Sequence, residues 1–101
     1  MKKYLIKCNG KNIGETDLEF VDETMGMHFG KFYPGELYSE FQSLFRDAFK
    51  KQNWDNLTFK IISSSTNRDL MFNFVWISDD PDFPEDIEIT VNVNSEDEKY
   101  N

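Results

Sequence analysis

The chain has 101 residues, a formal net charge of −8 and a single cysteine. This length accommodates one domain, and a lone cysteine excludes an intrachain disulfide. Ten Phe, four Tyr and two Trp supply the aromatic surface for a hydrophobic core. No apolar run approaches the roughly 20 residues of a membrane-spanning helix, and Lys7 and Asn9 interrupt the apolar segment near the N-terminus. We therefore expect a cytoplasmic protein that does not enter a membrane.

The first third of the chain predicts a meander of three antiparallel strands. Residues 3–8 alternate weakly, and Asn9 and Gly10 form a strong turn signal because both tolerate positive φ. Residues 15–21 and 25–29 alternate with a period of two, which is typical of strands with one solvated face.

An amphipathic helix is predicted to begin near Pro34 and to end at Lys50 and Lys51. Proline is tolerated in a first helical turn, and the helix dipole favours cations in the last turn. One apolar stripe follows the helical period: Leu37, Phe41, Leu44, Phe45, Ala48 and Phe49. We expect this stripe to pack against the sheet.

Three further strands are predicted after the helix, at residues 57–62, 70–77 and 87–93. The middle strand is apolar on both faces, which indicates a central strand or a face covered by a partner. One face carries Leu70, Phe72, Phe74 and Trp76, and the other carries Met71, Val75 and Ile77. In the last strand, Ile87, Ile89, Val91 and Val93 alternate with polar residues.

The predicted order is therefore β-β-β-α-β-β-β. Hairpin connections favour a mostly antiparallel sheet of six strands, and one helix packed across it predicts a two-layer α+β sandwich. We expect residues 1–94 to form this single domain and residues 95–101 to form a frayed acidic tail.

The negative charge is concentrated near the C-terminus. Residues 1–78 hold ten acidic and ten basic side chains, whereas residues 79–101 hold nine acidic side chains and one basic side chain. This distribution disfavours direct nucleic-acid binding, which requires basic groups for the phosphates. It favours a basic protein partner. The alternative is that the acidic segment only aids solubility.

The expected partner-binding residues precede the last strand. They are Asp79, Asp80, Asp82, Phe83, Glu85 and Asp86. Phe83 lies between Pro81 and Pro84, so its ring would be a rigid anchor of the kind that dominates binding energy at interfaces.

The sequence contains no recognisable catalytic or metal-binding set. His28 has no evident nucleophile and orienting acid, and Cys8 has no evident group to stabilise a thiolate. A single Cys and a single His do not make an ordinary zinc site. The carboxylates from Asp80 onward resemble a calcium loop, but its sixth and twelfth positions hold Glu85 and Val91 instead of Gly and Glu. We therefore expect a non-enzymatic protein without a cofactor.

Residues 22–38 read D-x-x-M-G-x-x-x-G-x-F-x-P-x-x-x-Y. This segment of 17 residues resembles one in small uncharacterised bacterial proteins, some of which are encoded beside toxins as immunity proteins. Its glycines, methionine and proline would shape a junction between a strand and the helix. The resemblance implies an immunity-type role but no reaction and no catalytic residue.

Three functional hypotheses follow. The first is a domain that binds and neutralises a basic protein, most specifically a nuclease-like toxin. The second is a small-ligand-binding or enzymatic domain with a pocket between helix and sheet, lined by Tyr33, Tyr38, Trp54 and His28. The third is a self-associating protein, such as a homodimer, that uses the apolar face formed by Met71, Val75 and Ile77.

Overall fold

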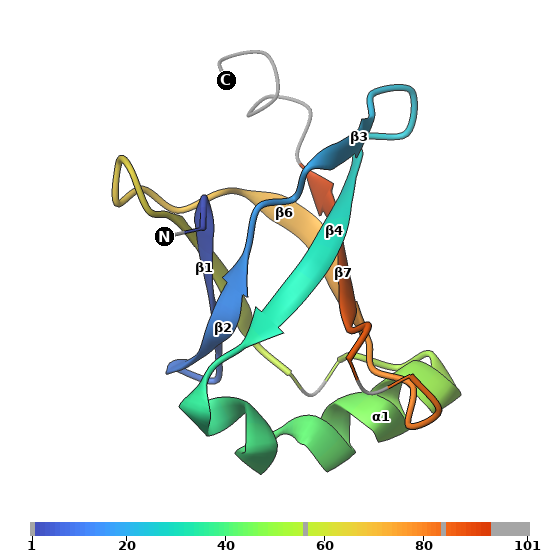
Figure 1. Cartoon of the computed structure of the whole chain (residues 1–101). Helices are drawn as coiled ribbons and strands as arrows, with labels where there is room; N and C mark the ends of the chain where they lie inside the picture. The colour runs from blue at the N-terminus through green and yellow to red at the C-terminus, as the bar shows by residue number, and fades with distance from the viewer. Residues whose placement is uncertain (1, 56, 84, 94–101) are drawn as a thin grey trace.

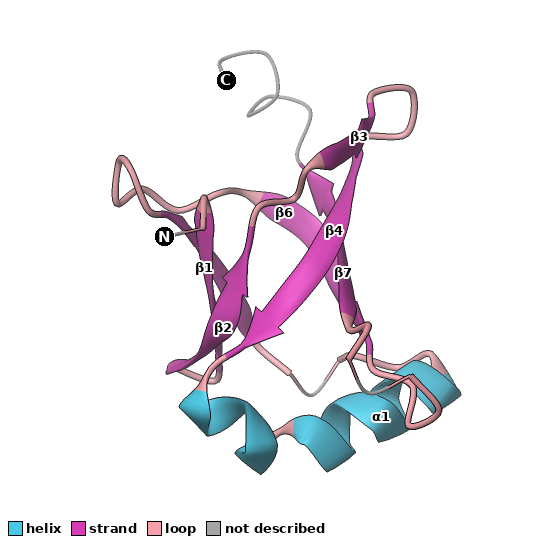
Figure 2. Cartoon of the chain, in the orientation of Figure 1, coloured by secondary structure: helices cyan, strands magenta, loops and turns pink. Residues whose placement is uncertain are grey.

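The computed structural model describes residues 2–55, 57–83 and 85–93. Within these residues it contains seven strands, one short 3₁₀ helix and one α-helix. The strands are β1 (Tyr4–Cys8), β2 (Lys11–Thr16), β3 (Phe20–Asp22), β4 (Met27–Pro34), β5 (Phe59–Ser63), β6 (Phe72–Ser78) and β7 (Glu88–Val93). The helices are η1 (Glu36–Glu40) and α1 (Gln42–Lys51). This composition confirms the predicted α+β class (Figure 2). The predicted acidic tail, residues 95–101, lies outside the described residues.

The sheet is curled into a half-barrel, and η1 and α1 cover one of its ends (Figure 1). Its order is β5-β1-β2-β4-β7-β6, and all the pairings among these strands are antiparallel. The long strand β4 organises one side. Its first half pairs with β3 and its last residues pair with β2, while β7 pairs along its other edge.

The predicted second strand, residues 15–21, is two strands in the structure. Strand β2 begins earlier, at Lys11, and ends at Thr16, and β3 begins at Phe20. Between them, Leu18 has a positive φ of 47°. The buried hydroxyl of Thr16 accepts a hydrogen bond from the Leu18 N–H at 3.2 Å and donates one to the Lys31 carbonyl at 2.8 Å. This side-chain turn breaks the strand, so four strands precede the helices instead of the predicted three.

The predicted single helix is a 3₁₀ helix followed by an α-helix, joined at Phe41. The tighter 3₁₀ winding shifts the buried stripe, because three residues rather than 3.6 complete each turn. The buried residues are Tyr38, Phe41, Phe45 and Ala48. Leu37, Leu44 and Phe49 were predicted in the stripe but are exposed. The lysines of the last turn are placed as predicted, and Gln52 ends the helix in the left-handed conformation.

The predicted faces of the fifth strand hold within residues 74–77 but not across Phe72, and β6 is an edge strand of the sheet rather than a central one. The register with β7 shifts between Phe72 and Phe74, which is a β-bulge with one extra residue. Beyond this bulge the alternation is inverted, so Val75 and Ile77 enter the core. The apolar face that was expected to support self-association is therefore interior at two of its three positions. The last strand is as predicted: Ile87, Ile89, Val91 and Val93 are all buried.

The aromatic side chain at the centre of the core is Phe45, which is completely buried. Its ring centroid lies 5.6 Å from that of Tyr38 and 5.8 Å from that of Phe41, both on the helical segment. Its centroid also lies 6.0 Å from that of Trp54 and 5.8 Å from that of Phe59, and Phe59 is the first residue of β5. One side chain thus joins the helices to β5.

We predict that Phe45→Ala lowers the free energy of unfolding by about 3–5 kcal/mol, because it leaves a cavity among four aromatic rings. Leu44→Ala is the matched control, since its side chain is 50% exposed. Urea denaturation should show a change of less than about 1 kcal/mol for this control. Equal losses for the two variants would contradict the observed helix orientation.

Candidate functional site

Asp79 begins the acidic segment, and it is buried rather than exposed. Its residue exposure is 1%. The carboxylate accepts hydrogen bonds from the Tyr38 hydroxyl at 2.7 Å, the Gln42 side-chain amide at 3.2 Å and the Arg46 Nε at 3.2 Å. A buried carboxylate is costly unless it is paired and hydrogen-bonded, and these three donors satisfy that requirement. Asp79 therefore ties the acidic segment to η1 and α1.

Tyr38 is the fully interior donor of this cluster. Burial, followed by the hydrogen bond to Asp79, raises the pKa of its hydroxyl well above the ordinary value of 10.0. The hydroxyl is therefore protonated at neutral pH and can donate. Tyr38, Gln42 and Arg46 are four residues apart in sequence, so helical spacing could have grouped the donors. Nothing in the sequence pointed to Asp79 as their acceptor.

The other predicted partner-binding residues, Asp80, Asp82, Phe83, Glu85 and Asp86, are exposed, and we call them the acidic loop. The loop lies beside the end of α1 (Figure 1). The Asp80 carboxylate accepts a hydrogen bond from the Asp82 N–H at 2.9 Å, and the Asp80 carbonyl accepts one from the Phe83 N–H at 2.9 Å. The Phe83 carbonyl accepts one from the Asp86 N–H at 3.0 Å. Two consecutive turns therefore present the Phe83 side chain, which is 60% exposed.

The acidic loop is held at both ends. Asp79 anchors its beginning, and the Ile87 carbonyl after its end accepts a hydrogen bond from the Phe32 N–H at 2.8 Å. Ion pairs between described residues involve none of the four loop carboxylates. The loop carboxylates therefore form a group of negative charges that has no ion-pair partner in the described part of the chain.

A second exposed feature lies on the outer side of the sheet. Phe20, Phe29, Thr90 and Trp76 form one row across β3, β4, β7 and β6, because each is the cross-strand partner of the next. The Phe20 and Phe29 rings are stacked with their centroids 5.5 Å apart, and the ring centroids of Phe74 and Trp76 are 4.7 Å apart. Phe20 is 56% exposed, Phe29 39% and Trp76 38%. We call Phe20, Phe29, Phe74 and Trp76 the outer aromatic face.

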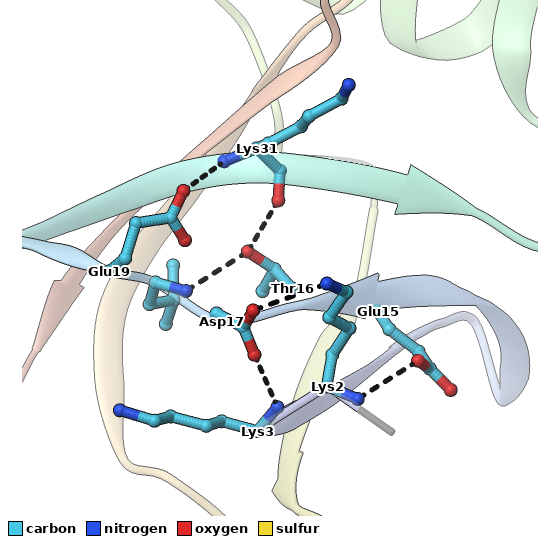
Figure 3. Close-up of polar contacts among 8 residues, drawn as sticks. Lys2, Lys3, Glu15, Thr16, Asp17, Glu19 and Lys31 are labelled. Carbon is cyan, nitrogen blue, oxygen red and sulfur yellow. Dashed lines mark hydrogen bonds and ion pairs between the residues drawn. The ribbon is translucent and has the colours of Figure 1, made fainter.

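A cleft of about 320 Å³ connects the outer aromatic face with the end of the acidic loop. Its walls include Phe20 and Phe29 together with the acidic residues Glu19, Asp86 and Glu88 and the basic residue Lys31. One wall of the cleft follows the break at Leu18, where the Glu19 side chain lies against β4 (Figure 3).

Glu19 is positioned by two features of β4. Its carboxylate accepts a hydrogen bond from the Lys31 N–H at 3.4 Å (Figure 3). It also covers Gly30, where a Cβ atom would lie 2.7 Å from the Glu19 Oε2. Because Gly30 has no side chain, it admits the close approach of the Glu19 carboxylate.

The N-terminal segment is hydrogen-bonded to the chain beside the break between β2 and β3. Asp17 accepts a hydrogen bond from the Lys3 N–H at 2.9 Å, and the Lys2 ammonium lies 3.5 Å from its other carboxylate oxygen (Figure 3). The backbone hydrogen bond from Lys3 is the main cause that lowers the pKa of Asp17 below its ordinary value. Contacts from the N-terminal segment and from β4 therefore both hold the chain at the break between β2 and β3.

The four residues proposed for a pocket between helix and sheet are not placed as one site. Tyr38 and Trp54 both pack against Phe45 in the core. Tyr33 is exposed, with the Lys2 ammonium 4.2 Å from its ring centroid. His28 lies on β4 between β3 and β7. This arrangement gives no convergence of titratable groups on one cavity.

The chemistry-bearing residues considered earlier are also separated. Cys8 is completely buried on β1, and burial raises the pKa of its thiol to about 11. Among the described residues, no three His, Cys, Asp or Glu side chains lie close enough to hold a metal ion. None of the described helices is long and apolar enough to cross a membrane.

Comparisons with known proteins add no relative to this description. No protein-family model matches the chain, and no curated protein or solved structure matches it either. The resemblance of residues 22–38 to immunity proteins stays a prediction.

We predict that Asp79→Ala lowers the free energy of unfolding by about 3 kcal/mol, because it leaves the buried Tyr38 hydroxyl and the Arg46 guanidinium without their acceptor. Glu85→Ala removes one exposed carboxylate from the same segment and should change this free energy by less than about 0.5 kcal/mol. Urea denaturation of both variants provides the measurement. A small effect of Asp79→Ala would show that the cluster does not anchor the segment.

The pKa of Cys8 predicts an alkaline loss of stability. The thiol is neutral in the folded chain up to a pKa of about 11, whereas the unfolded chain ionises at about 9.0. The stabilisation is complete below the unfolded pKa and is lost as pH rises through the folded pKa. The free energy of unfolding of the wild type should therefore fall relative to that of Cys8→Ala between these two values. Parallel pH curves would contradict this prediction.

Proposed function

We propose that this protein is a non-catalytic, cytoplasmic domain that binds a basic protein partner through the acidic loop. The observation that carries the proposal is the ordered loop itself: Phe83 is 60% exposed among carboxylates that have no ion pair with described residues. An anchored loop loses little conformational entropy on binding, so its contacts are retained as affinity.

The charges and the aromatic ring would have different roles. Carboxylates at the edge of an interface steer a basic partner and raise the association rate, and their effect weakens with salt. A rigid aromatic side chain such as Phe83 supplies apolar contact area near the centre of an interface. The combination suits a partner with a positively charged cleft.

The most specific form of the proposal is an immunity-type neutraliser of a nuclease-like toxin. A nuclease cleft is basic because it binds phosphates. A row of carboxylates on a fixed loop would occupy such a cleft in place of the nucleic-acid backbone. The resemblance of residues 22–38 to proteins encoded beside toxins supports the same role.

The test uses affinity capture from the lysate of the source cells at low and high salt, with three forms of the full chain. The loop variant carries Asp80→Asn, Asp82→Asn and Glu85→Gln. The control variant carries Glu23→Gln, Glu36→Gln and Asp55→Asn, so both lose three exposed negative charges. We expect one basic protein to be retained by the wild type and the control, and lost by the loop variant or at high salt.

The purified partner then allows a quantitative check. We expect the loop variant to bind it roughly tenfold more weakly than the control does, and the wild type to inhibit its nuclease activity at equal concentration. Equal retention by all three forms would rule out the acidic loop as the binding element. Capture of no specific protein, or of an acidic one, would overturn the proposal for the proteins expressed in those cells.

A further inference from the structure

The outer aromatic face lies on the side of the sheet that faces away from the core. The core lies on the other side of the same strands, where Val75, Ile89 and Val91 are buried. Phe20 and Phe29 are nevertheless stacked side by side at the surface. A cluster of exposed aromatic rings on an ordered sheet is typical of a protein interaction surface.

The formal charge of the cleft beside this face is net negative, because Glu19, Asp86 and Glu88 outnumber Lys31. Glu88 is the cross-strand partner of Lys31, but no ion pair between them is present in the described residues. The Lys31 ammonium instead lies 5.5 Å from the centroid of the Tyr33 ring, further along β4. Asp86, at the mouth of the cleft, likewise has no ion pair with a described residue. The cleft next to Phe29 is therefore lined by three acidic residues and one basic residue, Lys31, and neither Asp86 nor Glu88 has an ion pair with a described residue.

We infer that the cleft between the outer aromatic face and the acidic loop receives an arginine side chain of the basic protein partner. The inference rests on the proposed function and extends it, because it assigns a second contact region and the chemistry of the group that enters it.

An arginine fits the observed combination better than the other cations of proteins. A guanidinium group is planar and weakly hydrated, so it stacks on an aromatic ring while its N–H groups reach carboxylates. The Phe20–Phe29 pair offers the ring surface, and Glu88 and Asp86 offer the acceptors. A lysine ammonium would pair with the carboxylates but would gain less from the rings.

Charge also argues against the other occupants of such a face. A second copy of this chain carries the same net charge of −8, which opposes self-association through an acid-bordered surface. Nucleic-acid bases stack on aromatic rings, but their phosphates would meet Glu88 and Asp86. A basic polypeptide is the occupant whose charge and shape both match.

The experiment is a titration of the ¹⁵N-labelled full chain with the peptide acetyl-Gly-Arg-Gly-amide, followed by amide chemical shifts. The control peptide contains citrulline, which keeps the size and planarity of arginine but has no charge. We expect saturable shifts concentrated at residues 19–20, 29–31 and 86–88 for the arginine peptide only. The citrulline peptide should leave these amides unchanged at the same concentrations.

Matched variants assign the binding to the rings and the carboxylate. Phe29→Leu and Glu88→Gln should each weaken arginine-peptide binding by roughly threefold to fivefold. Phe49→Leu removes an equally exposed ring on α1, and Glu36→Gln removes an exposed charge on η1. These two controls should bind the peptide as the wild type does.

The outcomes separate the inference from the proposed function. The variant Asp80→Asn, Asp82→Asn and Glu85→Gln spares the walls of the cleft, so it should bind the arginine peptide normally even though it loses the protein partner. Shifts scattered over all exposed carboxylates, or equal shifts with citrulline, would overturn the inference and leave the loop proposal intact. Concentration-dependent shifts of Phe29 and Trp76 without peptide would overturn it in favour of self-association.

Discussion

The carboxylate of Asp79 is the constraint on which the arrangement of the acidic segment depends. A negative charge removed from water must find donors inside the protein, and Tyr38, Gln42 and Arg46 supply them from one side of the helical segment. This requirement determines where the chain after β6 meets α1. The acidic residues that follow Asp79 are exposed, so a buried charge positions the beginning of the exposed segment.

Two local irregularities produce the outer aromatic face. The side-chain turn of Thr16 directs β3 along the first half of β4, which brings Phe20 onto Phe29. The bulge between Phe72 and Phe74 reverses the alternation of β6 and turns Trp76 outward. Regular strands would have distributed these rings differently. Such interruptions of a sheet are common next to binding surfaces, because they redirect side chains without altering the core.

The acidic loop and the outer aromatic face meet at the beginning of β7. The loop ends at Asp86. Ile87 follows, and its carbonyl accepts a hydrogen bond from the Phe32 N–H; Glu88 is then the first residue of the strand. Its acidic side chain borders the cleft beside Phe29. Apolar rings and unneutralised carboxylates are therefore neighbours on one surface. A basic polypeptide could use both, with charge guiding its approach and stacking holding it in place.

The sequence by itself determined the features that depend on neighbouring residues. These were the α+β class, the turn at Asn9 and Gly10, the cations that end α1 and the alternation of β7. Only the tertiary structure decided the burial of Asp79, the inward side of β6 and the position of Glu19 over Gly30. The sequence did not distinguish Asp79 from the neighbouring exposed acids, because its hydrogen-bond donors lie more than 30 residues away along the chain. Periodicity reports which residues share a face within one element. The partner of that face, and any single-residue break in the period, is selected by packing between distant segments.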